Sequence, residues 1–129
     1  MNQKGFATLE IILAVTIIGI LAAVAVPRFT DVTAKANTAK IQADLSTLDS
    51  AIAIYEMEKG DNPTQLSDLK IYVQDIDNLK PPTGSAFIGS STATKITATN
   101  YAITEKTVGD VKSMRATLDG KTAGEFGKK

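Results

Sequence analysis

The chain contains no cysteine, no histidine and no tryptophan among its 129 residues. Without cysteine it cannot form a disulfide or offer a thiolate to a metal. Without histidine it lacks the commonest metal ligand, the commonest general base and every nucleophile that a histidine activates. We therefore expect a protein that is not an enzyme and that needs no cofactor and no metal.

The chain also lacks an excess of charge of either sign, because 14 lysines and arginines balance 14 aspartates and glutamates. A basic excess is the usual mark of a nucleic-acid-binding domain, so a nucleic-acid partner is possible but unsupported. A basic strip could still form from Lys95, Lys106, Lys112, Arg115 and Lys121. With few aromatic residues to accompany these cations, a solvated sheet face is the favoured interpretation.

Apolar residues are concentrated near the N-terminus. A short polar segment, residues 1–5, precedes an apolar run over residues 6–26, and no charged residue lies between Ile11 and Val26. As a helix, the run would be about 31 Å long, which is close to the thickness of a bilayer's hydrocarbon core. Pro27 closes the run.

Two general interpretations of this run are a cleaved signal peptide, with Ala23 to Ala25 as its small-residue cleavage site, and a plain signal anchor. Neither explains Glu10, which lies near the start of the run. A carboxylate at the centre of a bilayer costs roughly 2.5–3.5 kcal/mol, so a third interpretation must supply a reason for it.

The segment KGFATLEIILAVTIIGILAAVAVP, residues 4–27, resembles the N-terminal signature of type IV pilins and of the related pseudopilins. The resemblance implies cleavage between Gly5 and Phe6 and N-methylation of Phe6. It also assigns assembly roles to Phe6, to Glu10, to the helix-weakening Gly19 and to Pro27. These five positions agree with the family in a single register, although the resemblance covers less than a quarter of the chain.

Glu10 acquires a role from this resemblance. Cleavage would create an α-amino group at the membrane face, and two opposite charges in a low-dielectric environment attract strongly. In the family the amine belongs to one subunit and the glutamate to its neighbour. The implied partners are further copies in a helical filament, a prepilin peptidase, an inner-membrane assembly platform and, before assembly, membrane lipid.

The implied protein is a structural filament subunit, a major pilin or major pseudopilin. It would sit in the inner membrane as a single-pass protein and then in a periplasmic or cell-surface filament used for secretion, DNA uptake, adhesion or motility. The alternative is a membrane-anchored binding protein that never polymerises. The division expected is a cleaved leader over 1–5, a transmembrane and assembly helix over 6–27, and a globular domain over 28–129.

A second helical pattern follows Pro27. An apolar residue recurs every three or four positions, at Ile41, Leu45, Leu48, Ile52 and Tyr55. This spacing predicts one buried stripe. If Pro27 only kinks the chain, residues 6–58 form one helix that ends before Gly60.

The remaining residues predict a small antiparallel sheet of two to four strands packed on the second half of that helix. Residues 95–106 read as a strand with a break near Asn100, and residues 111–118 read as its partner. Residues 83–92 read as a loop, and the last six residues read as a frayed tail. The fold class is therefore α+β and pilin-like, with an N-terminal helix that is apolar in its first half and amphipathic in its second.

Other candidate sites have simpler explanations. Oxygen ligands for calcium could come from Asp61, Asn62, Asp68, Asp75, Asp77 and Asn78. Their spacing is not that of an EF-hand, so solvated turn carboxylates are favoured. Glu105 and Asp110 could form an acid–base pair, but solvated charge is favoured. The glycines at 84 and 89 belong to no phosphate-binding loop, because no Gly-Lys-Ser/Thr follows.

Overall fold

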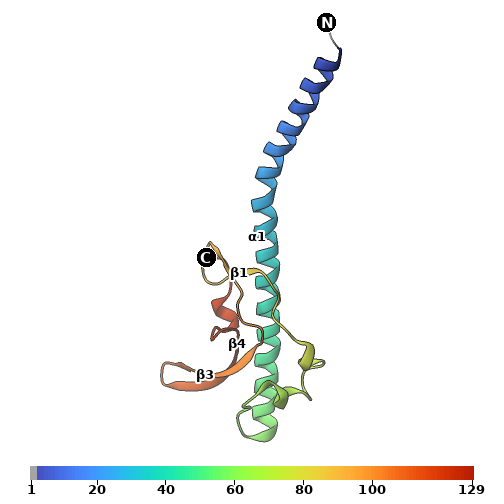
Figure 1. Ribbon diagram of the computed structural model, residues 1–129. Helices are drawn as coiled ribbons and strands as arrows, with labels where there is room; N and C mark the ends of the chain where they lie inside the picture. The colour runs from blue at the N-terminus through green and yellow to red at the C-terminus, as the bar shows by residue number, and fades with distance from the viewer. Residues whose placement is uncertain (1–2) are drawn as a thin grey trace. The chain divides into compact units, whose positions relative to one another are not determined.

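The computed structural model describes residues 3–129, apart from the side chain of Pro27. Figure 1 shows the elements in chain order: α1 (Gln3–Lys59), η1 (Leu66–Leu69), η2 (Ile76–Asn78), β1 (Ser85–Phe87), β2 (Ala93–Lys95), β3 (Ala102–Val108), β4 (Val111–Thr117) and η3 (Ala123–Glu125). The chain divides into two units that meet between Val32 and Thr33. An α+β architecture with one long N-terminal helix is confirmed.

Helix α1 begins at Gln3, three residues before the predicted start, and its backbone stays helical through Pro27. Proline removes one backbone hydrogen bond but does not prevent helical dihedrals after it. The helix ends at Lys59, one residue after the predicted end and directly before Gly60, which takes a left-handed φ of 69° and whose N–H donates to the Glu56 carbonyl. Glycine adopts this conformation without steric cost, which makes it a common helix terminator.

The core of the second unit is built on the predicted stripe of α1. Ile41, Leu45, Leu48 and Ile52 are almost fully buried, while Tyr55 is half-buried at the end of the row. Ala116 and Leu118 cover this row from the β side, and Leu69 and Ile76 cover it from the two short helices. Burial of each large side chain stabilises the fold by about 1.5–3 kcal/mol.

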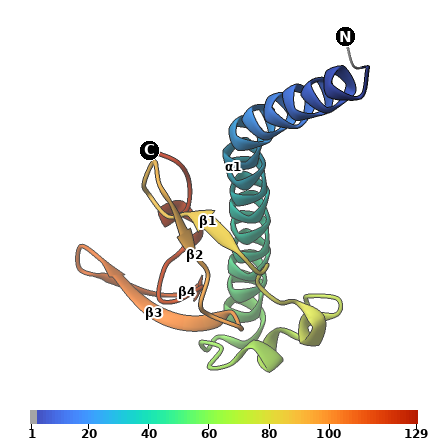
Figure 2. The same cartoon turned by 45° about the horizontal axis from the view of Figure 1, so that its top comes forward.

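The β region is two separate hairpins rather than one sheet. β1 pairs with β2, and β3 pairs with β4, both antiparallel (Figure 2). The predicted strand over 95–106 is wrong in extent, because residues 96–101 belong to no strand and connect the end of β2 to the start of β3. Tyr101 turns inward there and is buried, so the predicted break widens into a six-residue connection.

The prediction of a simple loop over 83–92 is also wrong, because β1 lies within it. Phe87 is buried, and its backbone N–H donates to Thr38 Oγ1 of α1 at 2.8 Å. Thr38 Oγ1 in turn donates to the Ala34 carbonyl at 2.7 Å. A contact with a side chain of the helix replaces one bond of a sheet ladder, and periodicity in the sequence does not reveal such a contact.

The C-terminal segment is attached to the body, so the prediction of a frayed tail is wrong. Phe126 is buried, and its carbonyl accepts a hydrogen bond from Gln42 Nε2 at 2.7 Å. Gly127 donates to the Phe87 carbonyl at 2.9 Å. The ammonium of Lys128 lies 5.3 Å from the centre of the Phe87 ring, a cation–π contact.

Candidate functional site

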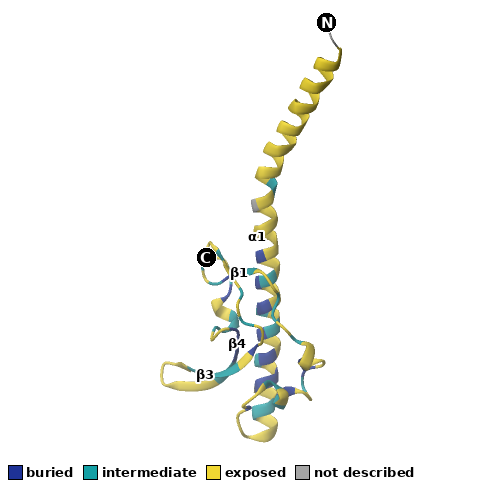
Figure 3. Ribbon diagram, viewed as in Figure 1, coloured by how far each residue is buried: buried dark blue, intermediate teal, exposed yellow. Residues whose placement is uncertain are grey.

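The predicted assembly segment, residues 6–27, is helical, and its large apolar side chains are exposed. These side chains, from Phe6 to Val26, are each between 55 and 64% exposed (Figure 3). An apolar helix that no described residue covers is typical of a segment that contacts lipid or other protein chains. By length and composition, α1 is able to cross a membrane.

Hydroxyl groups in this segment are satisfied locally. Thr8 Oγ1 donates to the Lys4 carbonyl at 2.9 Å, and Thr16 Oγ1 donates to the Ile12 carbonyl at 2.7 Å. Such bonds to the preceding turn leave the hydroxyl without need of water. Both threonines are therefore compatible with a hydrocarbon environment, where an unsatisfied donor is costly.

Glu10 is different, because its carboxylate forms no hydrogen bond and no ion pair anywhere in the part of the chain that the structure describes. It is exposed on α1 among apolar neighbours. Phe6 lies four residues before it, on the same face of the helix. The structure thus places an unpartnered negative charge one turn after the predicted cleavage point.

Gly5, Gly19 and Pro27 all lie within α1. A Cβ atom added at Gly5 or Gly19 would meet nothing within 4 Å, so packing inside this chain does not require glycine at either position. The predicted leader, residues 1–5, is helical from Gln3, and its first two residues lie outside the described part of the chain.

Two of the carboxylates considered for calcium, Asp68 and Asp77, have other partners. Asp68 accepts hydrogen bonds from the backbone N–H groups of Thr64 and Gln65, and these bonds lower its pKa. Asp77 pairs with Lys70 at 2.8 Å, and this hydrogen bond raises the pKa of the lysine. Over residues 3–129, no three acidic side chains gather into a metal-binding group.

The five cations considered as a basic strip are largely engaged in local contacts, in keeping with the favoured interpretation of a solvated face. Arg115 pairs with Asp49, Lys112 pairs with Glu105 at 3.1 Å, and Lys106 donates to the Gly120 carbonyl. Glu105 is therefore bound to a lysine rather than to Asp110. Lys121 interacts electrostatically with Glu125. Of the five cations, Lys95 alone has no side-chain partner within residues 3–129.

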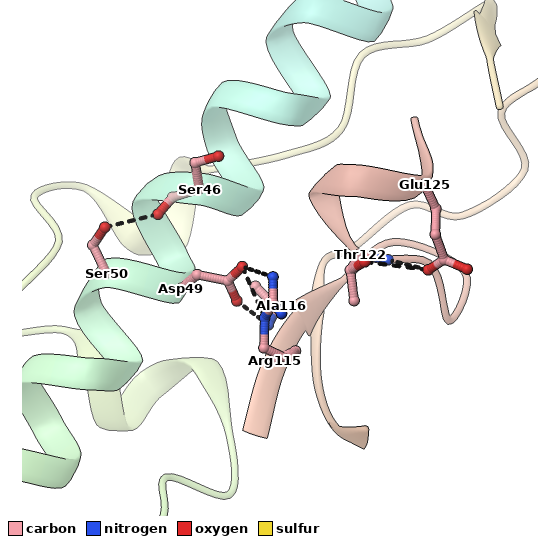
Figure 4. A network of polar contacts seen from close by, with 7 residues as sticks. All are labelled: Ser46, Asp49, Ser50, Arg115, Ala116, Thr122 and Glu125. Carbon is pink, nitrogen blue, oxygen red and sulfur yellow. Dashed lines mark hydrogen bonds and ion pairs between the residues drawn. The ribbon is translucent and has the colours of Figure 1, made fainter. Parts of the chain in front are cut away.

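Sequence reasoning missed the polar side chains of α1 that hold the body. Asp49 accepts from Arg115 Nε and Nη2 and from the Ala116 backbone N–H, which ties β4 to the helix (Figure 4). Asp44 accepts from the Tyr101 hydroxyl at 2.6 Å, and Asn37 donates to two carbonyls of the chain leading into β1. The sequence feature that could have identified these polar residues is their position on the helix next to the predicted buried stripe.

Comparison with known proteins gives three informative relatives. The chain is 44% identical over 64 residues to the type IV narrow pilus major component PilA5 of Thermus thermophilus, covering 50% of this chain and 55% of that protein. It is 33% identical over 72 residues to the type II secretion system core protein G of Klebsiella michiganensis, covering 56% and 51%. It is 43% identical over 49 residues to a fimbrial protein of Pseudomonas aeruginosa, covering 38% and 32%.

These relatives support the predicted resemblance to the type IV pilin and pseudopilin family. The chain spans about half the length of the first relatives that it matches. These pilin and pseudopilin relatives are named as components of pili and secretion systems rather than as enzymes, in agreement with the predicted structural role. No family model matches this chain, and no solved structure matches it.

Proposed function

We propose that this chain is the repeating subunit of a type IV filament. It is cut between Gly5 and Phe6, methylated at Phe6, held in the inner membrane by residues 6–27, and then polymerised. The observation that carries the proposal is the unpartnered Glu10 carboxylate on an exposed apolar helix. A group that is costly in lipid and unpaired among residues 3–129 calls for a partner from another chain.

That partner is the α-amino group that cleavage creates on Phe6 of another copy. Without cleavage, residue 6 carries only a neutral peptide nitrogen, so processing and charge pairing depend on each other. The ion pair sets the axial register between neighbouring helices, because each helix offers one amine and one carboxylate a single turn apart. Assembly then removes both the charges and the apolar surface from lipid.

Gly19 and Pro27 are weak points in the same helix. Packing among the described residues does not require glycine at position 19, and Pro27 has no N–H to donate to a helical hydrogen bond. We assign them to loosening of the helix between the two positions as the subunit leaves the bilayer. The remaining partners are a prepilin peptidase, an inner-membrane assembly platform and further copies of this chain.

The decisive experiment combines the mature N-terminus with a matched pair of variants. Mass spectrometry of the protein from native membranes should find a chain that begins at Phe6 and carries one added methyl group. Glu10→Ala should still insert in the membrane but yield at least tenfold less filament in the sheared fraction. Asp31→Ala removes an exposed carboxylate from the same helix outside the apolar run and should assemble normally.

An intact Met1, or normal filaments from Glu10→Ala, would overturn this function. Either result would favour the alternative, a single-pass membrane-anchored binding protein that does not polymerise. Glu10→Gln distinguishes the effect of the carboxylate charge from that of side-chain size, because glutamine has nearly the same shape and no charge. We expect it to assemble as poorly as the alanine variant.

A further inference from the structure

A groove in the second unit lies at the open end of the first hairpin, beyond the last paired residues of β1 and β2. Because β1 and β2 are antiparallel, the chain that enters β1 and the chain that leaves β2 meet at the same end of the pair (Figure 2). Residues 80–84 form one wall and residues 95–99 form the other, around a volume of about 390 Å³. That volume falls in the range typical of small-ligand pockets, roughly 300–1,000 Å³.

Both ends of the groove are closed by hydrogen bonds. At the hairpin end, the Ile96 N–H donates to the Gly84 carbonyl at 2.7 Å. At the other end, Lys80 Nζ donates to Asn100 Oδ1 at 2.6 Å. The first wall is also anchored to α1, because Asn37 Nδ2 donates to the Thr83 carbonyl at 3.1 Å. The groove is therefore formed by fixed segments of chain.

Its lining is mainly apolar, but it includes two lysines and three threonines and contains no acidic residue. Lys95 and the hydroxyl groups of Thr83 and Thr97 have no partner within residues 3–129. The backbone N–H groups of residues 97–99 are likewise not bonded to any acceptor in that range. Lys80 is bonded only to a neutral amide, so its positive charge is not neutralised.

The floor is apolar and shallow, with Pro81, Pro82, Ile96 and Ala98 half-buried in it. A neighbouring apolar hollow on the other side of residues 95–98 holds only about 20 Å³, which is too small for more than a water molecule. That hollow is bordered by Asp119, the acidic side chain nearest to Lys95 among the lining residues of the two sites.

We propose that this groove binds a small ligand bearing a carboxylate or phosphate group. The anionic oxygens face Lys95 and Lys80, the threonine hydroxyls and free amides supply neutral hydrogen bonds, and the proline floor accepts the carbon skeleton. Ligands of this class include sugar acids and sugar phosphates. Because the cations are exposed, attraction is partly screened and binding weakens as ionic strength rises.

The groove can be tested on the full chain in neutral-detergent micelles by the amide resonances of residues 97–99. Titration with glucuronate, glucose 6-phosphate and inorganic phosphate distinguishes a carboxylated sugar, a phosphorylated sugar and the bare anion. Sodium chloride at matched ionic strength is the control. We expect saturable shifts of these three resonances with at least one of the two sugar anions, and none with chloride.

Lys95→Ala should reduce the affinity at least fivefold, because it removes a cation that holds no other contact. Lys59→Ala removes an exposed cation at the end of α1, far along the chain from both walls, and should bind normally. Thr97→Glu places a negative charge in the groove and should abolish binding while the remaining spectrum is unchanged. Absence of saturable shifts, or equal binding by Lys95→Ala, would refute the site and would leave the filament proposal untouched.

Discussion

The carboxylate of Asp49 lies 2.8 Å from Arg115 Nη2 and 2.8 Å from the backbone nitrogen of Ala116. One side chain of α1 therefore holds both the side chain and the backbone of β4. The hydrogen bond to Asp49 raises the pKa of Arg115, which keeps the guanidinium charged. This pairing is the most direct polar link between the helix and the second hairpin.

Asp49→Ala should lower the free energy of unfolding of the second unit by about 1–3 kcal/mol, because it leaves the Ala116 N–H and the guanidinium without their acceptor. Asp110→Ala, at the exposed turn between β3 and β4, should change it by less than about 0.5 kcal/mol. Denaturant unfolding of the full chain in micelles, followed by circular dichroism, measures both. Equal stability of the two variants would mean that apolar packing alone positions β4.

Phe126→Ala should lower the free energy of unfolding by about 3 kcal/mol, since it empties a buried site under β1 and removes a large apolar surface. Lys129→Ala, two residues beyond Gly127, should have almost no effect. Limited proteolysis gives a second measurement, because loss of Phe126 should release the C-terminal segment and expose it to cleavage. Unchanged resistance of Phe126→Ala would show that the segment adds nothing to stability.

Gly84→Ala should destabilise the second unit by about 1–2 kcal/mol. Gly84 has a φ of 105°, and a Cβ there would lie 3.3 Å from Asn37 Nδ2. Alanine at this position would therefore strain both the backbone and the contact with α1. Gly124→Ala is the matched control, because its backbone is unstrained and its added Cβ meets nothing within 4 Å. Thermal unfolding of the two variants side by side provides the measurement, and a neutral Gly84→Ala would be inconsistent with this geometry.

Alkaline pH should destabilise the protein through Tyr101. Burial, followed by the hydrogen bond to Asp44 and the charge of that carboxylate, raises the pKa of Tyr101 above its ordinary value of 10.0. The unfolded state therefore loses the phenolic proton first, and the stability contributed by the protonated hydroxyl is present below pH 10 and lost as pH rises further.

Tyr101→Phe should be less stable at neutral pH but should lose less stability between pH 10 and 11.5. The lysines titrate in both proteins, so the difference between the two unfolding curves isolates the tyrosine. The carboxylate facing the hydroxyl is Asp44, which also pairs with Lys40, and the comparison leaves both in place. Parallel pH profiles would exclude a contribution from Tyr101.

Local patterns were sufficient for α1 and its termination. The three- and four-residue spacing from Ile41 to Ile52 marks a buried stripe, because side chains three or four positions apart share one face of a helix. Gly60 was a reliable end signal, because a left-handed residue stops a helix at low cost.

The β region was harder to predict, because its strands are short and partly bonded to side chains. β1 has only three residues and rests on Thr38, so no alternation long enough to recognise was present. The connection over 96–101 looks like a strand by composition, yet Tyr101 turns inward to Asp44 instead of continuing a ladder. The C-terminal residues show no helix or strand periodicity, and their order depends on contacts with Gln42 and Phe87.

By itself the sequence determined an apolar helix that carries one carboxylate, the stripe on which the body is built, and the resemblance to the pilin family, because helix periodicity and a charge in an apolar run are local properties. Only the tertiary structure decided that Glu10 has no partner among the described residues, that Asp49 and Gln42 hold the strands and the C-terminus, and that a groove opens between residues 80–84 and 95–99. Those facts depend on which distant segments meet, and contacts between residues forty or more positions apart leave no period in the chain.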